Sequence, residues 1–260
     1  MKGKSMNILF TICGRAGSKG IKNKNLRMFC GEPLAYYSLS AIDLYLKTGK
    51  RTDNHDIVIN SDSHELLKLM KDNPFITVDT IVRSDKLSGD AVAKKDVILD
   101  CINQMEERKG CRYDVVVDLD ITSPLRTKED VARLINKHLE TNADITYSVT
   151  TARRNPYFNQ VTYTEAEGAR KVIMSDFTAR QQAPVIYDMN ASLYAYKPEH
   201  LKNGGDFNNG YHAVIEMYDT AVLDLDHEQD FELMEIIADY LYQKYPEFNE
   251  VRENIVCSKI

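Results

Sequence analysis

Glycines and basic residues alternate over residues 14–25 of this 260-residue chain. One glycine in every three residues allows the backbone to turn sharply and to direct N–H groups at an anion. The glycines are Gly14, Gly17 and Gly20, and the basic residues are Arg15, Lys19, Lys22 and Lys24. Residues 1–31 contain no carboxylate, although the net charge of the chain is −6. The segment is therefore predicted to be an anion-binding loop.

The glycine spacing matches neither of the two common phosphate motifs. A P-loop ends in Gly-Lys-Ser/Thr, whereas the order here is Ser18-Lys19-Gly20. The dinucleotide fingerprint is Gly-x-Gly-x-x-Gly, whereas the spacing here is Gly-x-x-Gly-x-x-Gly. A connecting loop whose glycines only permit close packing is the alternative, but it leaves the cations unexplained.

Two pairs of aspartates lie two residues apart, which places both members on one face of a strand. Asp224 and Asp226 form one pair, and their carboxylates are suited to holding Mg²⁺ against phosphate oxygens. The alternative is an exposed acidic turn before a helix, where acidic residues are favoured. Asp118 and Asp120 form the second pair, at the end of an apolar run.

The rest of the chain alternates β-rich runs with helical periodicity. Strands are predicted over 7–13, 56–60, 75–78, 113–119, 144–149, 190–197 and 221–226. Helices are predicted over 33–47, 63–71, 90–108, 128–140 and 229–245. This alternation predicts an α/β fold with a doubly wound, mostly parallel, Rossmann-like sheet. The loop at 14–25 would follow the first strand, at the sheet edge where such folds bind ligands.

The pattern changes at about residues 150–188. Two strand-like runs, 159–164 and 170–174, are joined by a turn at 165–168, which predicts an inserted β-hairpin. Because no repeat or flexible linker interrupts the chain, we expect one domain over 1–260 that carries this insertion.

Composition narrows the class of protein. The five cysteines are odd in number and lack metal-ligand spacing, so we expect reduced thiols. The acidic net charge argues against nucleic-acid binding. The chain has no run of about 18 apolar residues, so no membrane span is predicted. No signal peptide is expected either, so the predicted location is cytoplasmic.

A set of motifs in order along residues 7–245 resembles the CMP-sialic acid synthetase, or acylneuraminate cytidylyltransferase, family. The motifs are Arg15-x-Gly17-Ser18-Lys19-Gly20, Lys24-Asn25, Gly31-x-Pro33-Leu34, Ser61-Asp62, Arg83 with Leu87 and Asp90, Thr122-Ser123-Pro124-Leu125-Arg126, Arg180-Gln181-Gln182, Asn190 and Asp224-Leu225-Asp226. Related enzymes that activate KDO share parts of this set. The resemblance implies transfer of CMP from CTP to the anomeric hydroxyl of a 2-keto-3-deoxy sugar acid, with release of pyrophosphate.

The resemblance also implies roles for individual residues. Nucleotide binding is expected of Cys13, Gly14, Arg15, Gly17, Ser18, Lys19, Lys24, Asn25, Ser61, Asp62 and Arg83. Catalysis by charge neutralisation is expected of Arg15, Lys19, Lys24 and Asp226, with Mg²⁺ held by Asp224 and Asp226. We expect the Cys13 thiol to pack against the core and not to act as a nucleophile.

The sugar side departs from the family pattern. Sugar binding is expected of Asp120, Thr122, Ser123, Arg180, Gln181, Asp188 and Asn190. Asp120 stands where sialic acid enzymes commonly have glutamine, Asp188 replaces a basic residue, and Phe158 lies near the position of a lysine. Asp120 could accept a hydrogen bond from the sugar, assist the metal or cap the following turn. These departures suggest a different nine-carbon acid, such as legionaminic or pseudaminic acid, destined for a cell-surface glycan.

Three further expectations follow from the resemblance. The inserted hairpin would be a dimerisation arm, which makes a homodimer the expected assembly. A nucleotidyltransferase that uses KDO or a sugar 1-phosphate is the nearest alternative. A non-catalytic nucleotide-binding homologue is the other, and it would be expected to have lost the loop cations or the metal pair.

Overall fold

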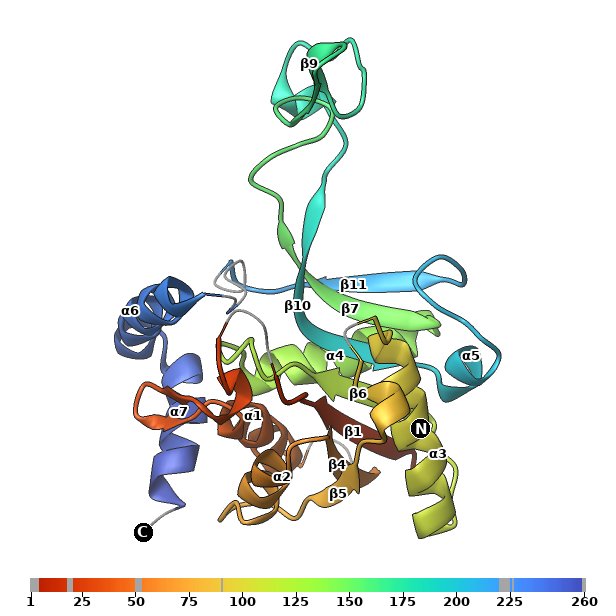
Figure 1. Cartoon of the computed structure of the whole chain (residues 1–260), viewed down its shortest axis with the longest axis vertical. Helices are drawn as coiled ribbons and strands as arrows, with labels where there is room; N and C mark the ends of the chain where they lie inside the picture. The colour runs from red at the N-terminus through yellow and green to blue at the C-terminus, as the bar shows by residue number, and fades with distance from the viewer. Residues whose placement is uncertain are drawn as a thin grey trace.

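A seven-stranded sheet forms the centre of the computed structural model, which describes residues 5–17, 21–49, 53–89, 91–219, 225 and 227–258 (Figure 1). The strand order is β11-β7-β10-β6-β1-β4-β5. The strands are β1 (Asn7–Cys13), β4 (Asn54–Ser61), β5 (Asp79–Val82), β6 (Val115–Leu119), β7 (Ile145–Thr151), β10 (Tyr187–Tyr196) and β11 (His212–Glu216).

All neighbouring strands of this sheet are parallel except where β10 is involved. β10 runs antiparallel to both β6 and β7, between which it lies. The pairs β1–β4, β1–β6, β4–β5 and β7–β11 are parallel. The prediction of a mostly parallel α/β sheet is thus confirmed, and the carboxyl ends of β1, β4 and β6 meet along one edge.

Helices cover both faces of the sheet because its central strands are apolar on both sides. In β1, Ile8, Phe10 and Ile12 enter one buried cluster, and Leu9 enters the other. α1 (Tyr36–Lys47), α2 (His64–Lys71), α4 (Lys128–Thr141), α6 (Glu228–Lys244) and α7 (Pro246–Cys257) pack on the first side. α3 (Lys94–Lys109) and α5 (Pro198–Lys202) pack on the second. The result is the doubly wound arrangement that the alternation predicts.

The inserted segment forms an arm that projects from the sheet (Figure 1). Its hairpin pairs β8 (Val161–Thr164) with β9 (Gly168–Lys171) in antiparallel register, so the predicted hairpin is confirmed. Every residue of β8 is exposed in the single chain. Among the described residues, the apolar side chains of the arm therefore lack the cover that a sheet face normally has.

Two predicted boundaries are wrong. Pro33 does not open a helix, because Glu32–Pro33 (β3) pairs with Met28–Phe29 (β2) across a tight turn, and α1 begins at Tyr36. Residues 75–78 do not form a strand, because the Asn73 side chain binds the backbone N–H groups of Phe75 and Ile76 in a turn.

The sequence pattern does not predict several elements, among them α5, β11 and α7. β11 occupies the sheet edge beside β7, and α7 follows α6 and begins at Pro246. The strand predicted over 221–226 lies outside the described residues, except for Leu225, which is buried in the core. No helix within the described part of the chain is both long and apolar enough to cross a membrane.

Candidate active site

The predicted anion-binding loop leaves the carboxyl end of β1, at the edge where β4 and β6 also end. The Gly14 N–H donates to the Asn60 carbonyl at 3.2 Å, which ties the loop to β4. A Cβ on Gly14 would lie 2.6 Å from Leu66 Cδ2 and 2.8 Å from Ile121 Cδ1, so only glycine fits there. Gly17 has φ of +72°, a left-handed conformation that favours glycine for a different reason.

Two polar side chains hold the loop backbone in place. The Ala16 N–H donates to Asp62 Oδ1 at 2.6 Å, and Asn25 Nδ2 donates to the Arg15 carbonyl at 3.1 Å. Asp62 and Asn25 are both predicted nucleotide-binding residues. Their contacts here are with the loop itself, so any effect on nucleotide would pass through the shape of the loop. The same arrangement places Lys24 at the start of the short 3₁₀ helix Lys24–Leu26.

The end of β4 supplies a second buried polar group. Arg83 Nε donates to Asn60 Oδ1 at 2.7 Å, and its Nη2 donates to the Asn60 carbonyl at 3.0 Å. Ser61 Oγ accepts a 3.0 Å bond from the Ser63 N–H and is fully buried. Ser61 thus shapes the turn into α2. Arg83, however, also lines a pocket beside the loop.

That pocket has a volume of about 230 Å³ and joins the two halves of the predicted site. Arg15 and Cys13 line it from the loop, Lys94 from α3, and Asp120 from the end of β6. Contact with the Cys101 thiol and burial both raise the pKa of Cys13 well above its ordinary value, which favours the protonated thiol. This agrees with the prediction that Cys13 packs and does not act as a nucleophile.

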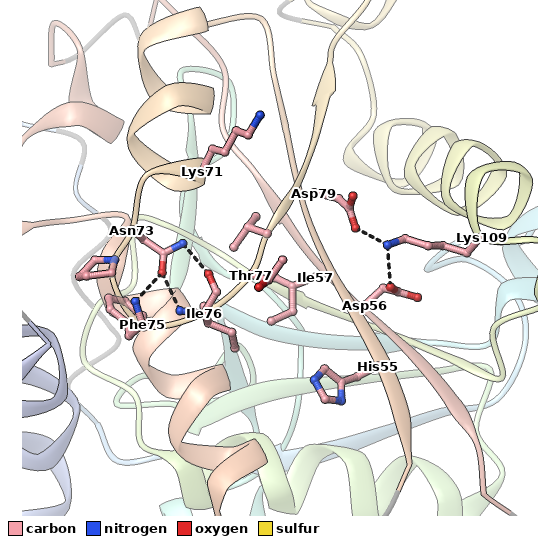
Figure 2. Close-up of a pocket in the computed structure, with 12 residues that line it drawn as sticks. His55, Asp56, Ile57, Lys71, Asn73, Phe75, Ile76, Thr77, Asp79 and Lys109 are labelled. Carbon is pink, nitrogen blue, oxygen red and sulfur yellow. Dashed lines mark hydrogen bonds and ion pairs between the residues drawn. The ribbon is translucent and has the colours of Figure 1, made fainter.

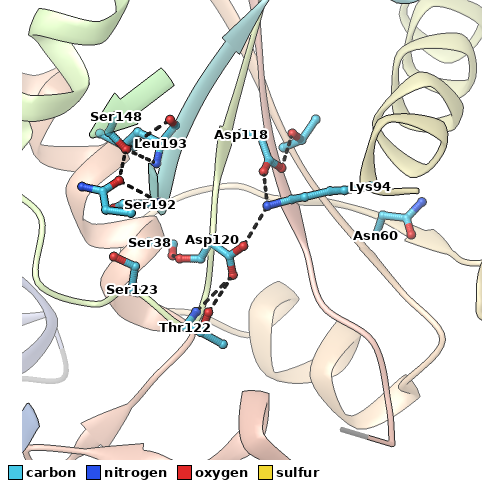
Figure 3. A network of polar contacts seen from close by, with 12 residues as sticks. Ser38, Asn60, Lys94, Asp118, Asp120, Thr122, Ser123, Ser148, Ser192 and Leu193 are labelled. Carbon is cyan, nitrogen blue, oxygen red and sulfur yellow. Dashed lines mark hydrogen bonds and ion pairs between the residues drawn. The ribbon is translucent and has the colours of Figure 1, made fainter. Parts of the chain in front are cut away.

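Lys94 lies between the two aspartates at the end of β6 (Figure 3). Its Nζ is 2.7 Å from Asp118 Oδ2 and 2.8 Å from Asp120 Oδ2. Burial lowers the pKa of Lys94, but the attraction of Asp118 and Asp120 outweighs it, and the pKa lies well above its ordinary value. Burial raises the pKa of Asp120, but Lys94 and the Thr122 N–H more than offset this and hold it below the ordinary value. Lys94 and Asp120 are therefore both charged near neutral pH.

Lys94 is a site residue that motif analysis missed. The chain does contain a signal for it: two adjacent lysines occupy the first turn of α3, where the helix dipole disfavours cations. An unfavourable charge at that position indicates a compensating partner elsewhere in the fold.

The predicted sugar residues Thr122 and Ser123 form a turn that is fixed from within. Thr122 N and Oγ1 donate to Asp120 Oδ1 at 3.3 and 3.0 Å. The guanidinium of Arg126 is fully buried and donates to the carbonyls of Asp120 and Ser123. Burial lowers the pKa of Arg126 to about 10, so it stays protonated near neutral pH. The Thr-Ser-Pro-Leu-Arg block thus holds Asp120 in place.

Asn190 is buried next to this turn, where a bulge in β10 places Ala191 at φ of +50°. Its Oδ1 accepts from Ser148 Oγ at 2.5 Å, while its Nδ2 has no hydrogen-bond partner among the described residues. A buried amide donor without a protein partner favours a polar ligand or water at this position.

Two other predicted residues, Gln181 and Asp188, are not among the described residues that line this pocket. Gln181 and Asp188 are exposed on the arm and its stem, and the side chain of Arg180 lies outside the described structure. Ser18, Lys19, Asp224 and Asp226 also lie outside the described residues. The described residues contain no group of three His, Cys, Asp or Glu side chains that could hold a metal, so the Mg²⁺ site stays a prediction.

A pocket of about 730 Å³ lies at the other ends of the strands (Figure 2). His55 and Asp56 line it from the start of β4, and Asp79 from the start of β5. Lys109 bridges the two carboxylates at 3.1 and 2.7 Å. Since none of its lining residues belongs to the predicted site, its size does not make it the nucleotide pocket.

The sequence and fold have clear relatives. A protein from Campylobacter coli named post-translational flagellin modification protein B is 33% identical over 234 residues, covering 88% of this chain and 94% of the relative. A CMP-N,N'-diacetyllegionaminic acid synthase from Campylobacter jejuni is 32% identical over 233 residues, with 88% and 94% covered.

A solved structure shares the fold at lower sequence similarity. CMP:2-keto-3-deoxy-manno-octonic acid synthetase, in complex with CTP, superposes with a TM-score of 0.60 at 12% identity, covering 90% of this chain and 99% of that one. The model of the cytidylyltransferase family matches residues 9–251. With a glycine-rich loop, a mostly parallel sheet and that match over nearly its whole length, this chain belongs to the cytidylyltransferase family.

Proposed function

We propose that this protein transfers CMP from CTP to a nine-carbon 2-keto-3-deoxy sugar acid of the legionaminic acid type. The observation that carries the proposal is one pocket lined by Arg15 of the glycine-rich loop and by Asp120 of the predicted sugar side. Membership of the cytidylyltransferase family supports the nucleotide half of the reaction.

In the proposed reaction, the anomeric oxygen of the sugar forms a bond to the α-phosphorus of CTP. The bond from that phosphorus to the bridging oxygen breaks, pyrophosphate leaves, and the anomeric hydroxyl loses its proton. Such transfers depend mainly on positioning and on neutralising charge at the phosphoryl oxygens. We assign this role to Arg15, which lines the pocket, and, by motif, to Lys19 and Lys24.

Mg²⁺ is the proposed metal, held by Asp224 and Asp226. Oxygen ligands suit it, and it would neutralise charge on the phosphate groups. The described aspartates at the end of β6 do not compete for this role, because Lys94 already neutralises Asp118 and Asp120.

The choice of sugar rests on the acceptor side. Asp120 replaces the glutamine common in sialic acid enzymes, and a relative of 32% identity is named for N,N'-diacetyllegionaminic acid. A carboxylate only accepts hydrogen bonds, whereas a glutamine amide also donates them, so the two side chains select different sugar groups. A sugar with an additional N–H or hydroxyl next to Asp120 fits, because that group would donate a hydrogen bond to the carboxylate.

A homodimer in the cytoplasm is the proposed assembly and location. The arm carries exposed apolar side chains on Val161, Tyr163 and Met174, and burial against a partner would remove them from water. An arm of this kind would add residues such as Gln181 to the neighbouring copy's pocket.

The test is release of pyrophosphate from CTP in the presence of N,N'-diacetyllegionaminic, pseudaminic, N-acetylneuraminic acid or KDO, with and without Mg²⁺. We expect the highest kcat/KM with a legionaminic-type acid, and loss of turnover in Asp226→Asn and in EDTA. Equal kcat/KM with N-acetylneuraminate would refute the choice of sugar. Binding of CTP without turnover of any acceptor would support a non-catalytic nucleotide-binding homologue. Preference for UTP or for a sugar 1-phosphate would support a different nucleotidyltransferase.

A further inference from the structure

Lys94 connects the predicted sugar side to the rigid centre of the sheet. Its ammonium lies 2.7 Å from Asp118 and 2.8 Å from Asp120 (Figure 3). It also lies 5.1 Å from the ring centre of Tyr194. Asp118 is itself fixed, because its Oδ1 accepts from Thr11 Oγ1 at 2.8 Å and its side chain has 0% exposure. The lysine therefore links the partly exposed Asp120 to the fully buried Asp118.

The arrangement is needed because two carboxylates face each other at a buried strand end. Residues two apart on a strand share a face, so Asp118 and Asp120 lie close together there. Without a cation, one of them would take up a proton or turn away, since like charges in a buried site repel strongly. Lys94 offsets this repulsion and determines the direction of the Asp120 carboxylate.

The hydrogen bonds of Asp120 leave little freedom. Its Oδ1 accepts two bonds from Thr122, and its Oδ2 accepts one from Lys94. A carboxylate oxygen has two acceptor positions, so Oδ2 retains one. With 24% of the side chain exposed, that position is available to a ligand in the pocket.

We propose that Lys94 is a positioning residue that orients Asp120 and keeps it ionised, and that the Lys94–Asp120 pair selects the acceptor sugar. This inference rests on the proposed function. The alternative role for Lys94 is a direct contact with phosphate. In that case its replacement would change the KM for CTP and not the KM for the sugar. The positioning role also implies that replacing Asp120 by glutamine changes acceptor preference fully only when Lys94 is replaced as well.

The variants that test this are Lys94→Met, Lys94→Arg, Asp120→Asn and the double variant Lys94→Met/Asp120→Asn. Lys95→Met is the matched control, because Lys95 is the next residue on α3 and pairs instead with Asp206 at 3.4 Å. For each, kcat and the KM values for CTP and for the sugar are measured, together with thermal unfolding.

We expect Lys94→Met to raise the KM for the sugar about tenfold, the usual cost of a lost charged hydrogen bond, while the KM for CTP changes less than about twofold. Lys94→Arg should recover part of the loss, and Lys95→Met should match the unmodified chain. The KM for the sugar in the double variant should be no higher than in the more impaired of the two single variants, because the pair acts as a unit.

A rise in the KM for CTP with an unchanged KM for the sugar would overturn the proposal, as would additive losses in the double variant. If Lys94→Met does not fold, Lys94→Arg and Asp120→Asn decide, and sugar KM values unchanged in both would overturn it. Absence of turnover in the unmodified chain with every acceptor would be a failure of the proposed function. Unchanged sugar KM in an active enzyme would be a failure of this inference alone.

Discussion

The carboxylate of Asp62 accepts a 2.6 Å hydrogen bond from the backbone N–H of Ala16. The bond joins the end of β4 to the middle of the glycine-rich loop, 46 residues apart in the chain. This hydrogen bond orients the loop backbone next to Arg15. The loop is thus shaped by a neighbouring strand as well as by its own glycines.

Replacing Asp62 by alanine should weaken CTP binding without greatly changing kcat. The loop would lose a hydrogen bond to a charged acceptor, which is worth about 1.5–3 kcal/mol, so we expect the KM for CTP to rise by about tenfold or more. Steady-state kinetics with varied CTP at saturating sugar give this value. Glu65→Gln, at an exposed position of α2, is the control and should leave the KM unchanged. A normal KM for CTP in Asp62→Ala would show that the loop holds its shape without this bond.

Gly14→Ala and Gly17→Ala should destabilise the protein for different reasons. The new methyl group at residue 14 would overlap Leu66 and Ile121, an overpacking cost of about 1–3 kcal/mol. At residue 17 there is open space, and only the positive φ is unfavourable, which costs about 1 kcal/mol. Urea unfolding measures both. Ile121→Val should relieve part of the first loss and none of the second; relief of both equally would contradict the steric explanation.

Stability should fall as the pH drops from about 7 towards 4 because of His138. This side chain is buried on α4, beside Thr146 Oγ1 at 3.0 Å, and burial, with Lys197 adding to it, lowers the pKa of His138 from 6.5 to about 4. Between these values the unfolded chain binds a proton that the folded chain does not. The contribution is therefore complete above the unfolded pKa and is lost below it, by about 3 kcal/mol in total.

Urea unfolding of His138→Gln across this pH range checks the expectation. The free energy of unfolding of the variant should fall less steeply with decreasing pH than that of the unmodified chain, whatever its value at pH 7. His64→Gln, at an exposed position, should retain the full decline. Parallel curves for His138→Gln and the unmodified chain would assign the pH dependence to other groups.

Polar substitutions on the arm should separate the proposed dimer. Tyr163 and Met174 are among the most exposed apolar side chains of the arm, at 73% and 75%. Tyr163→Ser combined with Met174→Ser should convert a dimer to a monomer in light scattering coupled to size-exclusion chromatography, since lost apolar burial weakens association. Ile236→Ser, at an exposed apolar site on α6, is the control outside the arm. A monomeric unmodified chain, or a dimer lost only in Ile236→Ser, would refute a role for the arm.

Much of the fold is predictable because it depends on local patterns. Hydrophobic periodicity indicates the central strands and most helices, and the alternation of the two indicates a doubly wound sheet. Local patterns fail at residue 33, where pairing of β3 with β2 sets the backbone conformation. They also fail at residues 75–78, where the Asn73 side chain accepts a hydrogen bond from the Phe75 N–H and holds a turn. They also miss β11, whose place at the sheet edge depends on its parallel pairing with β7.

Residue types and their spacing suffice to predict a basic, glycine-rich loop after the first strand. What the surrounding polar residues do depends on contacts between distant parts of the chain. Lys94 reaches Asp118 and Asp120 from 24 and 26 residues away, and Asp62 reaches Ala16 from 46. Such contacts depend on how helices pack on the sheet and on which way each side chain points. That geometry arises from burial over the whole chain, so no local pattern contains it.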